Sequence, residues 1–266
     1  MGQRCKEHGN DLADDGPMEF AYGSRAIRVN IPDKATLLAE VTRRFRSGTG
    51  FALATINLDH LVKLRQDPAF RDAYAAQDLV VADGNPIVWL SRLASRPVSL
   101  VTGSDLVIPL TQIAADEGVG IALVGTTDNA LEKAASEMTR RVPGCRIVAR
   151  IAPPMGFDPD SDTARALLRQ VRDSGARLCF LALGAPKQER LAALGRHEAP
   201  EVGFASVGAG LDFLAGDQRR APEWVRKIAM EWAWRMVSAP QRLVPRYARC
   251  AAILPAEALA ALRKRS

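Results

Sequence analysis

Short apolar runs and longer amphipathic stretches alternate along most of the chain. The short runs predict strands at 26–31, 51–56, 78–82, 119–124, 145–150, 177–183 and 203–207. Apolar residues at helical spacing predict helices at 33–47, 58–76, 85–94, 104–117, 127–142, 160–174 and 186–197. Several strands are apolar on both faces, as in a mainly parallel sheet with helices on both sides. The pattern therefore predicts an α/β, Rossmann-like domain.

The alternation ends near residue 217, and the remaining pattern is helical, with helices expected at 222–237, 240–252 and 256–264. Before the first predicted strand the chain is polar and irregular. We therefore expect three parts: a mobile N-terminal arm at 1–24, a Rossmann-like catalytic domain at 25–217, and a basic, Trp/Arg-rich helical appendage at 218–266.

The net charge of +6 is concentrated in the appendage. Residues 219–266 contain eleven Lys/Arg and three Glu, whereas residues 1–218 contain 25 Lys/Arg and 27 Asp/Glu. Basic helices that also carry Trp224, Trp232 and Trp234 suit an anionic membrane surface. The alternative is a helix pair that buries its aromatic residues on the sheet domain. Nucleic-acid binding is disfavoured because the sequence has no recognisable reading module.

The sequence has no run of about 20 apolar residues, and its N-terminus lacks the apolar core of a secretory signal. We therefore expect a cytoplasmic protein. The four cysteines are far apart and without CxxC spacing, which favours reduced thiols over a zinc site.

Candidate site residues follow the predicted strands, because ligands of open α/β sheets bind beyond the carboxyl ends of the strands. Thr55 and Asn57 end the second predicted strand, and Asp83 ends the third, followed by Gly84 and Asn85. A carboxylate there can face a ligand in the crevice. It can equally be an ordinary turn or helix-capping residue, so position alone leaves both roles open for Asp83.

Two later strand ends are candidate phosphate sites, because backbone N–H groups at a helix N-terminus suit an anion. One is at Gly125. The other runs from Gly184 to Glu189 and adds Lys187 and Gln188. The alternative for both segments is a plain capping turn.

Two further segments imitate cofactor sites. The run from Gly208 through Asp212 begins like a dinucleotide fingerprint, but Phe213 replaces the third glycine, which disfavours a nicotinamide cofactor. Asp158, Asp160 and Asp162 invite a metal site, but they precede a predicted helix, where acidic residues favour the helix dipole. We expect helix capping there and no required metal or other cofactor. A GxSxG nucleophile is absent, so hydrolase functions have little support.

Nine motifs in one order resemble the WecG/TagA/CpsF family of bacterial glycosyltransferases (glycosyltransferase family 26) over residues 25–250. They are TIN (55–57), ADG (82–84), TGSDL (102–106), LVG (123–125), LGAPKQE (183–189), VGAGLDFLAG (207–216), RAPEW (220–224), EWAWR (231–235) and PQRLVPRY (240–247).

The resemblance implies an inverting transfer of sugar from a UDP-sugar donor to a polyprenyl-diphosphate-linked glycan acceptor at the inner membrane face. It implies that Asp83 is the general base and that Thr55, Asn57 and Gln188 belong to the active site. It also implies an appendage that docks on the membrane and brings arginines over the donor diphosphate, here Arg220, Arg235, Arg242 and Arg246. With these, the predicted substrate-binding residues are Thr55, Asn57, Gly84, Asn85, Gly125, Gly184, Lys187, Gln188, Glu189, Gly208 and Asp212.

One position departs from the family pattern. Many members carry Arg three residues before the glycine of the TGSDL motif, where this chain has Leu100. A noncatalytic membrane-associated nucleotide-binding protein and, less favoured, an NAD(P)-dependent oxidoreductase remain the alternative functions. The donor sugar, the acceptor, the linkage and a possible homo-oligomer are not specified by the sequence.

Overall fold

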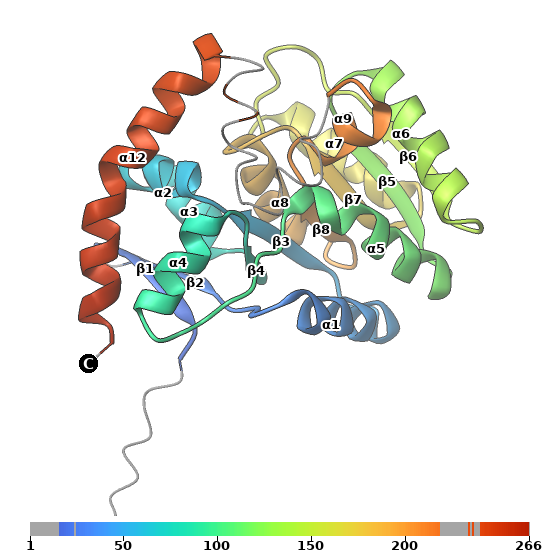
Figure 1. The fold of residues 1–266 in the computed structure, drawn as a ribbon. Helices are drawn as coiled ribbons and strands as arrows, with labels where there is room; N and C mark the ends of the chain where they lie inside the picture. The colour runs from blue at the N-terminus through green and yellow to red at the C-terminus, as the bar shows by residue number, and fades with distance from the viewer. Residues whose placement is uncertain (1–15, 24, 219–233, 235, 237–239, 266) are drawn as a thin grey trace, which may run out of the picture.

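A six-stranded parallel sheet forms the centre of the protein (Figure 1). The computed structural model describes residues 16–23, 25–218, 234, 236 and 240–265. The strands lie in the order β4-β3-β8-β7-β5-β6, and every pair is parallel. Their bounds are β3 Phe51–Ile56, β4 Leu79–Ala82, β5 Gly120–Gly125, β6 Arg146–Ile151, β7 Ala176–Ala182 and β8 Gly203–Ser206. The predicted α/β Rossmann-like class is confirmed.

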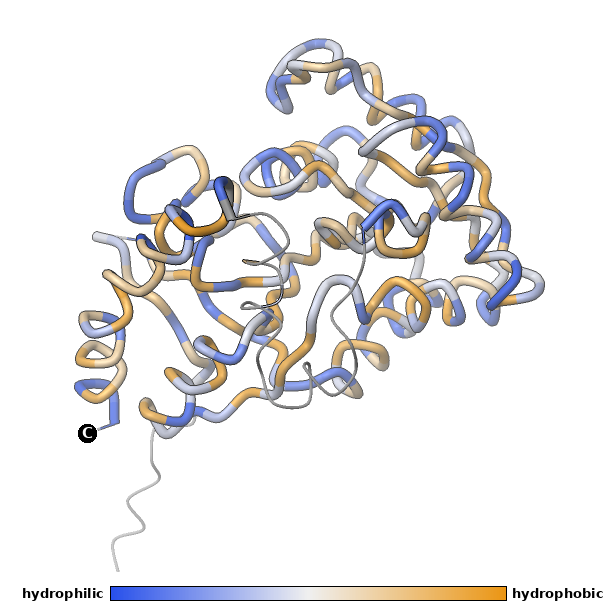
Figure 2. Tube along the Cα trace, turned by 45° about the horizontal axis from the view of Figure 1, so that its top comes forward, coloured by the Kyte–Doolittle hydropathy of each residue, from blue (hydrophilic) through white to orange (hydrophobic). Residues whose placement is uncertain are grey.

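Helices cover both faces of this sheet. On one face a single core joins α1 (Lys34–Ser47), α5 (Gly103–Asp116), α6 (Asp128–Arg141) and α9 (Gly210–Ala215) to the strands. On the other face lie α2 (Leu58–Gln66), α3 (Pro68–Ala75), α4 (Asn85–Leu93), α7 (Asp162–Asp173) and α8 (Lys187–Glu198). Successive strand residues point to opposite faces, so strands buried on both sides must be apolar throughout. Figure 2 shows this arrangement, with hydrophobic colour along the strands and hydrophilic colour on outward helix surfaces.

The N-terminal part of the described chain differs from the prediction. Met18–Tyr22 form strand β1, which pairs antiparallel with β2 (Arg25–Val29) in a separate two-stranded sheet. The predicted arm at 1–24 therefore contains a strand, and the first predicted strand does not join the central sheet. The physical reason is alternation: Met18 and Phe20 are 2% and 4% exposed and pack into the core beside α2, α3 and α4, while Glu19 is less buried.

The described end of the appendage is one long helix, α12 (Pro240–Arg263), where the sequence pattern predicted two. Pro245 and Pro255 both lie inside it. The helix runs beside α2 and α4 (Figure 1) and buries Leu243, Cys250 and Ala261, so tertiary packing stabilises a helix that proline would otherwise weaken. Among the described helices, α12 included, none combines the length and apolar character needed to cross a membrane. The predicted helix at 222–237 lies mostly outside the described residues.

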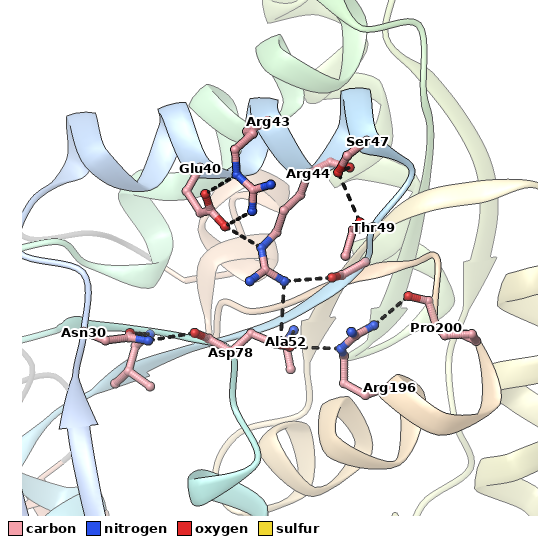
Figure 3. Close-up of polar contacts among 12 residues, drawn as sticks. Asn30, Glu40, Arg43, Arg44, Ser47, Thr49, Ala52, Asp78, Arg196 and Pro200 are labelled. Atoms are coloured by element: carbon pink, nitrogen blue, oxygen red, sulfur yellow. Dashed lines mark hydrogen bonds and ion pairs between the residues drawn. The ribbon is translucent and has the colours of Figure 1, made fainter.

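A polar network closes the sheet at the amino ends of its strands (Figure 3). Asp78, just before β4, accepts hydrogen bonds from the Ala52 N–H at 2.8 Å and from Arg196 Nε of α8 at 2.9 Å. Arg44 of α1 lies 3.6 Å from the same carboxylate, and Asn30 donates to the Asp78 carbonyl oxygen. Charged contacts thus connect β3, α8 and α1 at the amino ends of the strands. Ligands of such sheets bind at the opposite end, beyond the carboxyl ends of the strands.

Candidate active site

The candidate site is the crevice beyond the carboxyl ends of β4, β3, β8 and β7, which are neighbours in the sheet. From β3 the chain enters α2, whose Leu61 and Leu64 pack on one face. From β8 it enters α9, whose Leu211 packs on the opposite face. Adjacent strands whose connections leave to opposite faces open a crevice between them, where ligands of such sheets bind.

Asp83 lies at the edge of this crevice. Its backbone N–H donates to the Ile56 carbonyl oxygen at 2.7 Å, which fixes it beside the end of β3. Its side chain is partly exposed, and the Gly103 N–H makes a long contact of 3.5 Å to Oδ2. The N-cap of α4 is Gly84, at φ +118°, a conformation that L side chains rarely adopt. Asp83 therefore precedes the cap, and its side chain does not cap α4.

Thr55, Asn57 and Leu100 lie on the two segments that flank the end of β4, just before Asp83. Thr55 is 3% exposed, and a Cβ added to Gly103 would come within 3.3 Å of its Oγ1 and 3.1 Å of the Val207 backbone, so only glycine lets α5 begin this close. Asn57 caps α2 by accepting a hydrogen bond from the His60 N–H at 3.1 Å. Leu100 forms a β-bridge to Ala82 and is 44% exposed, so the departure from the family pattern lies beside Asp83.

The two candidate phosphate turns differ. After Gly125, the helix α6 is capped by Thr127, whose side chain accepts a hydrogen bond from the Ala130 N–H. After Gly184, α8 begins at Lys187 without a side-chain cap, and Lys187 is partly exposed. An uncapped terminus retains backbone donors that an anion can accept. The structure thus favours the turn at 184–189 over the turn at Gly125.

Gln188 joins this turn to the loop after β8. Its Oε1 accepts a hydrogen bond from the Gly208 N–H at 3.1 Å, and its Nε2 donates to Glu189 Oε1 at 2.8 Å. Glu189 is fully buried, so its carboxyl group contacts Gln188 instead of reaching a ligand as predicted. Burial raises the pKa of Glu189 to about 7, although the hydrogen bond from Gln188 opposes this.

Other predicted segments have structural roles. Asp212 lies in α9, and its carboxylate accepts a hydrogen bond from Gln218 at 3.0 Å. Phe213 lies inside the same six-residue helix, where a dinucleotide fingerprint would need glycine. Ser161 caps α7, so the capping role predicted for the acidic run is only partly right: Asp162 lies in the first turn of α7, whereas Asp160 pairs with Arg190 of α8. Within the described residues, no group of three His, Cys, Asp or Glu is placed to hold a metal ion.

An ion-pair cluster that the sequence analysis missed links α12 to the crevice. Asp59 Oδ2 lies 2.8 Å from Lys63 Nζ and 3.1 Å from Arg246 on α12. Lys63 also donates to the Ala185 carbonyl oxygen at 3.0 Å, in the turn before Gln188. Burial alone would raise the pKa of Asp59, but Lys63 and Arg246 together lower it. The only sequence signal was the spacing of Asp59 and Lys63, four residues apart on one helix face.

The ion pair with Asp59 therefore brings Arg246 close to the end of β3, because Asp59 follows Asn57 by two residues in the chain. The other predicted diphosphate arginines lie beyond what the structure describes: Arg220 and Arg235 fall outside the described residues, and of Arg242 only the backbone in α12 is described.

Comparison with known protein families matches residues 25–266 to the Glycosyl transferase WecG/TagA/CpsF family. The chain belongs to this family. The match spans nearly the whole chain, so the sheet and α12 both fall within it. Membership makes the protein a glycosyltransferase, with a sugar donor and an acceptor as its two substrates. The ordered motifs read from the sequence identified this family correctly.

Proposed function

We propose that this WecG/TagA/CpsF glycosyltransferase moves a sugar from a UDP-sugar to a polyprenyl-diphosphate-linked acceptor, with inversion at the anomeric carbon and Asp83 as general base. The observation that carries the proposal is the place of Asp83. Asp83 follows β4 and is partly exposed, and the neighbouring strand β3 carries the buried Thr55. In the sheet β7 lies two strands beyond β3, and α8 begins after β7 without a side-chain cap. This arrangement supports an acceptor that approaches Asp83 from the exposed side and a phosphate that binds at the start of α8.

Asp83 accepts the proton of the acceptor hydroxyl as its oxygen attacks the anomeric carbon. The bond from that carbon to the donor diphosphate breaks with its electron pair, and UDP leaves with the added negative charge. A positioned base contributes roughly 10²–10⁴-fold to such a step. Attack opposite the leaving group inverts the anomeric centre.

The leaving diphosphate needs positive partners, which we assign to the turn at 184–189 and to the arginines of the appendage. Lys187 supplies its ammonium group, while the Gln188 N–H of the α8 terminus already donates to the Gly184 carbonyl oxygen at 3.2 Å. Gln188 Nε2 has a second hydrogen beyond the one given to Glu189. Arg246 adds a cation near the end of β3. Arginine suits a diphosphate because its donors match two oxygens at once. We therefore propose that the reaction requires no metal ion.

We also propose that α12 docks on the anionic inner face of the membrane, where a polyprenyl-linked acceptor resides. The outward side of α12 carries Val244, Leu259 and Leu262, which are 48%, 52% and 46% exposed. Arg249 and Arg263 are exposed on the same helix. Exposed aliphatic residues mixed with arginines are typical of helices that lie in the membrane interface.

The test of the base assignment is Asp83→Asn in the full chain, with UDP release and glycan transfer measured on a panel of UDP-sugars and lipid-diphosphate acceptors. The amide keeps the size of the side chain but cannot take the proton. We expect kcat to fall by about 10²–10⁴-fold, with little change in thermal stability. Asp116→Asn, at the exposed far end of α5, is the matched control. Turnover of Asp83→Asn near that of the control would refute the assignment.

A further inference from the structure

Gln188 is held between two partners by a continuous chain of hydrogen bonds. The Gly208 N–H donates to Oε1 at 3.1 Å, and Nε2 donates to Glu189 Oε1 at 2.8 Å. Gln188 itself is 3% exposed and Glu189 is fully buried. The chain connects the turn after β7 to the loop after β8, which are neighbouring strands on the crevice.

The chemistry of the two partners fixes the orientation of the Gln188 amide. A backbone N–H can only donate, so this one hydrogen bond favours the amide oxygen on the Gly208 side. The NH₂ group is thereby turned towards Glu189, which offers an acceptor oxygen in both its neutral and its ionised form. Without the Glu189 acceptor, rotation of the Gln188 amide by half a turn would no longer cost the hydrogen bond between Nε2 and Glu189.

Burying the Glu189 carboxyl group costs folding free energy. Its Oε2 is buried and has no hydrogen-bond partner within the described part of the chain. The Gln77 amide donates to the Glu189 carbonyl oxygen at 3.1 Å, and the Lys63 ammonium acts on the carboxyl electrostatically by lowering its pKa. A leucine would bury the same volume without a polar group to desolvate. A buried carboxyl with one satisfied oxygen therefore points to a role beyond packing.

We propose that Glu189 is a positioning residue that orients the Gln188 amide. In this orientation Oε1 holds the Gly208 loop against the turn at 184–189, and the second hydrogen of Nε2 remains available to a donor-substrate oxygen. The consequence for catalysis rests on the proposed function. The orientation of the amide does not, because it follows from protein contacts alone.

Two variants of similar size separate orientation from packing. Glu189→Leu fills the site without an acceptor, whereas Glu189→Gln keeps an acceptor oxygen for Gln188. In Glu189→Leu we expect kcat to fall by roughly tenfold to a hundredfold and the Gly208 amide to exchange its hydrogen about tenfold faster. Glu189→Gln should stay within about threefold of the wild type in both measurements.

A double-mutant cycle with Gln188→Ala gives the deciding result. If Glu189 acts through Gln188, adding Glu189→Leu to Gln188→Ala should change kcat by less than about twofold. Additive losses, unchanged Gly208 exchange in Glu189→Leu, or failure of Glu189→Gln to restore both measurements would each overturn the proposal. If the wild-type protein transfers no sugar from any UDP-sugar, the proposed function fails, and Gly208 exchange in the same variants still decides the positioning role.

Discussion

Asp83, which follows β4, and Glu189, in the first turn of α8, are carboxyl groups with opposite surroundings. Asp83 is partly exposed at the end of β4, with a backbone N–H directed at its carboxylate. Glu189 is fully buried, and burial raises its pKa to about 7. Here the exposed group suits proton transfer, and the buried group suits a fixed hydrogen bond.

The raised pKa of Glu189 predicts a pH-dependent cost in stability. Below about pH 4.5 the group is protonated in both the folded and the unfolded chain, so it has no effect. Between about 4.5 and 7 only the unfolded chain releases the proton, which favours unfolding. Above about pH 7 the cost is constant, at roughly 3 kcal/mol from about 1.4 kcal/mol per pKa unit.

Glu189→Gln removes this proton equilibrium. Its free energy of unfolding relative to the wild type should therefore rise from near pH 4.5 to a plateau above pH 7, measured by urea unfolding at several pH values. Glu132→Gln, on the exposed side of α6, provides a matched control without such a rise. A difference between Glu189→Gln and the wild type that is the same at pH 4 and pH 8 would contradict the buried, proton-retaining carboxyl.

At the scale of elements, the Asp78 network shows how the amino ends of the strands are held (Figure 3). One carboxylate joins the start of β3 to α8 and approaches α1. Its removal leaves the N–H of the buried Ala52 without its acceptor, whereas Arg196 keeps the Pro200 carbonyl oxygen and Arg44 keeps Glu40 as partners. Losing charged hydrogen bonds of this kind costs about 2 kcal/mol.

Asp78→Ala should accordingly lower the free energy of unfolding by about 2 kcal/mol and leave kcat unchanged, because Asp78 lies at the end of the sheet opposite the crevice. Asp72→Ala breaks the Arg25–Asp72 pair, in which the two side chains are 58% and 62% exposed, and should cost less than about 1 kcal/mol. Thermal unfolding and steady-state kinetics of both variants check this. Equal losses of stability would show that the network does not hold the strand ends.

The elements that sequence periodicity located well are those whose pattern reflects local geometry. Strands apolar on both faces and helices with one apolar face were placed to within a few residues. The periodic pattern predicted one helix at 58–76, but the structure has two, because Asp67 caps a second helix that begins at Pro68. The Asp-Pro pair is a local signal for a helix start, and the prediction gave it less weight than the periodicity. The single helix α12 and the pairing of β1 depend on distant packing, which local patterns do not contain.

The same distinction applies to the crevice. Asp83, Thr55 and Gln188 follow strand ends that any reading of an α/β chain would inspect. The burial of Glu189, the contact of Leu100 with Ala82 and the cluster of Asp59, Lys63 and Arg246 arise where segments far apart in sequence meet. Apart from the four-residue spacing of Asp59 and Lys63, these contacts have no sequence signature, because the fold sets the partners.

At the scale of the whole molecule, α12 connects the basic end of the chain to the sheet domain. Glu257 pairs with Arg65 of α2 at 2.8 Å, Arg246 pairs with Asp59, and Lys264 donates to the Glu19 carbonyl oxygen in β1. Ile253, Leu254 and Ala258 pack against the core beneath α2 and α4. Deleting the helix would therefore expose core residues as well as remove charge, so deletion alone cannot separate docking from folding.

Substitutions on the outward side of α12 make that separation. Leu259→Glu and Leu262→Glu together should weaken binding to anionic liposomes by at least tenfold. The reason is that burial of each exposed leucine side chain in the interface contributes about 1.5 kcal/mol or more to the binding free energy. Thermal stability should change little, since the two side chains are 52% and 46% exposed. Val148→Glu, on a side chain that is 37% exposed in the edge strand β6, controls for an added charge elsewhere. If the double variant sediments with liposomes as the control does, α12 does not dock through this side, and the acceptor must reach Asp83 by another approach.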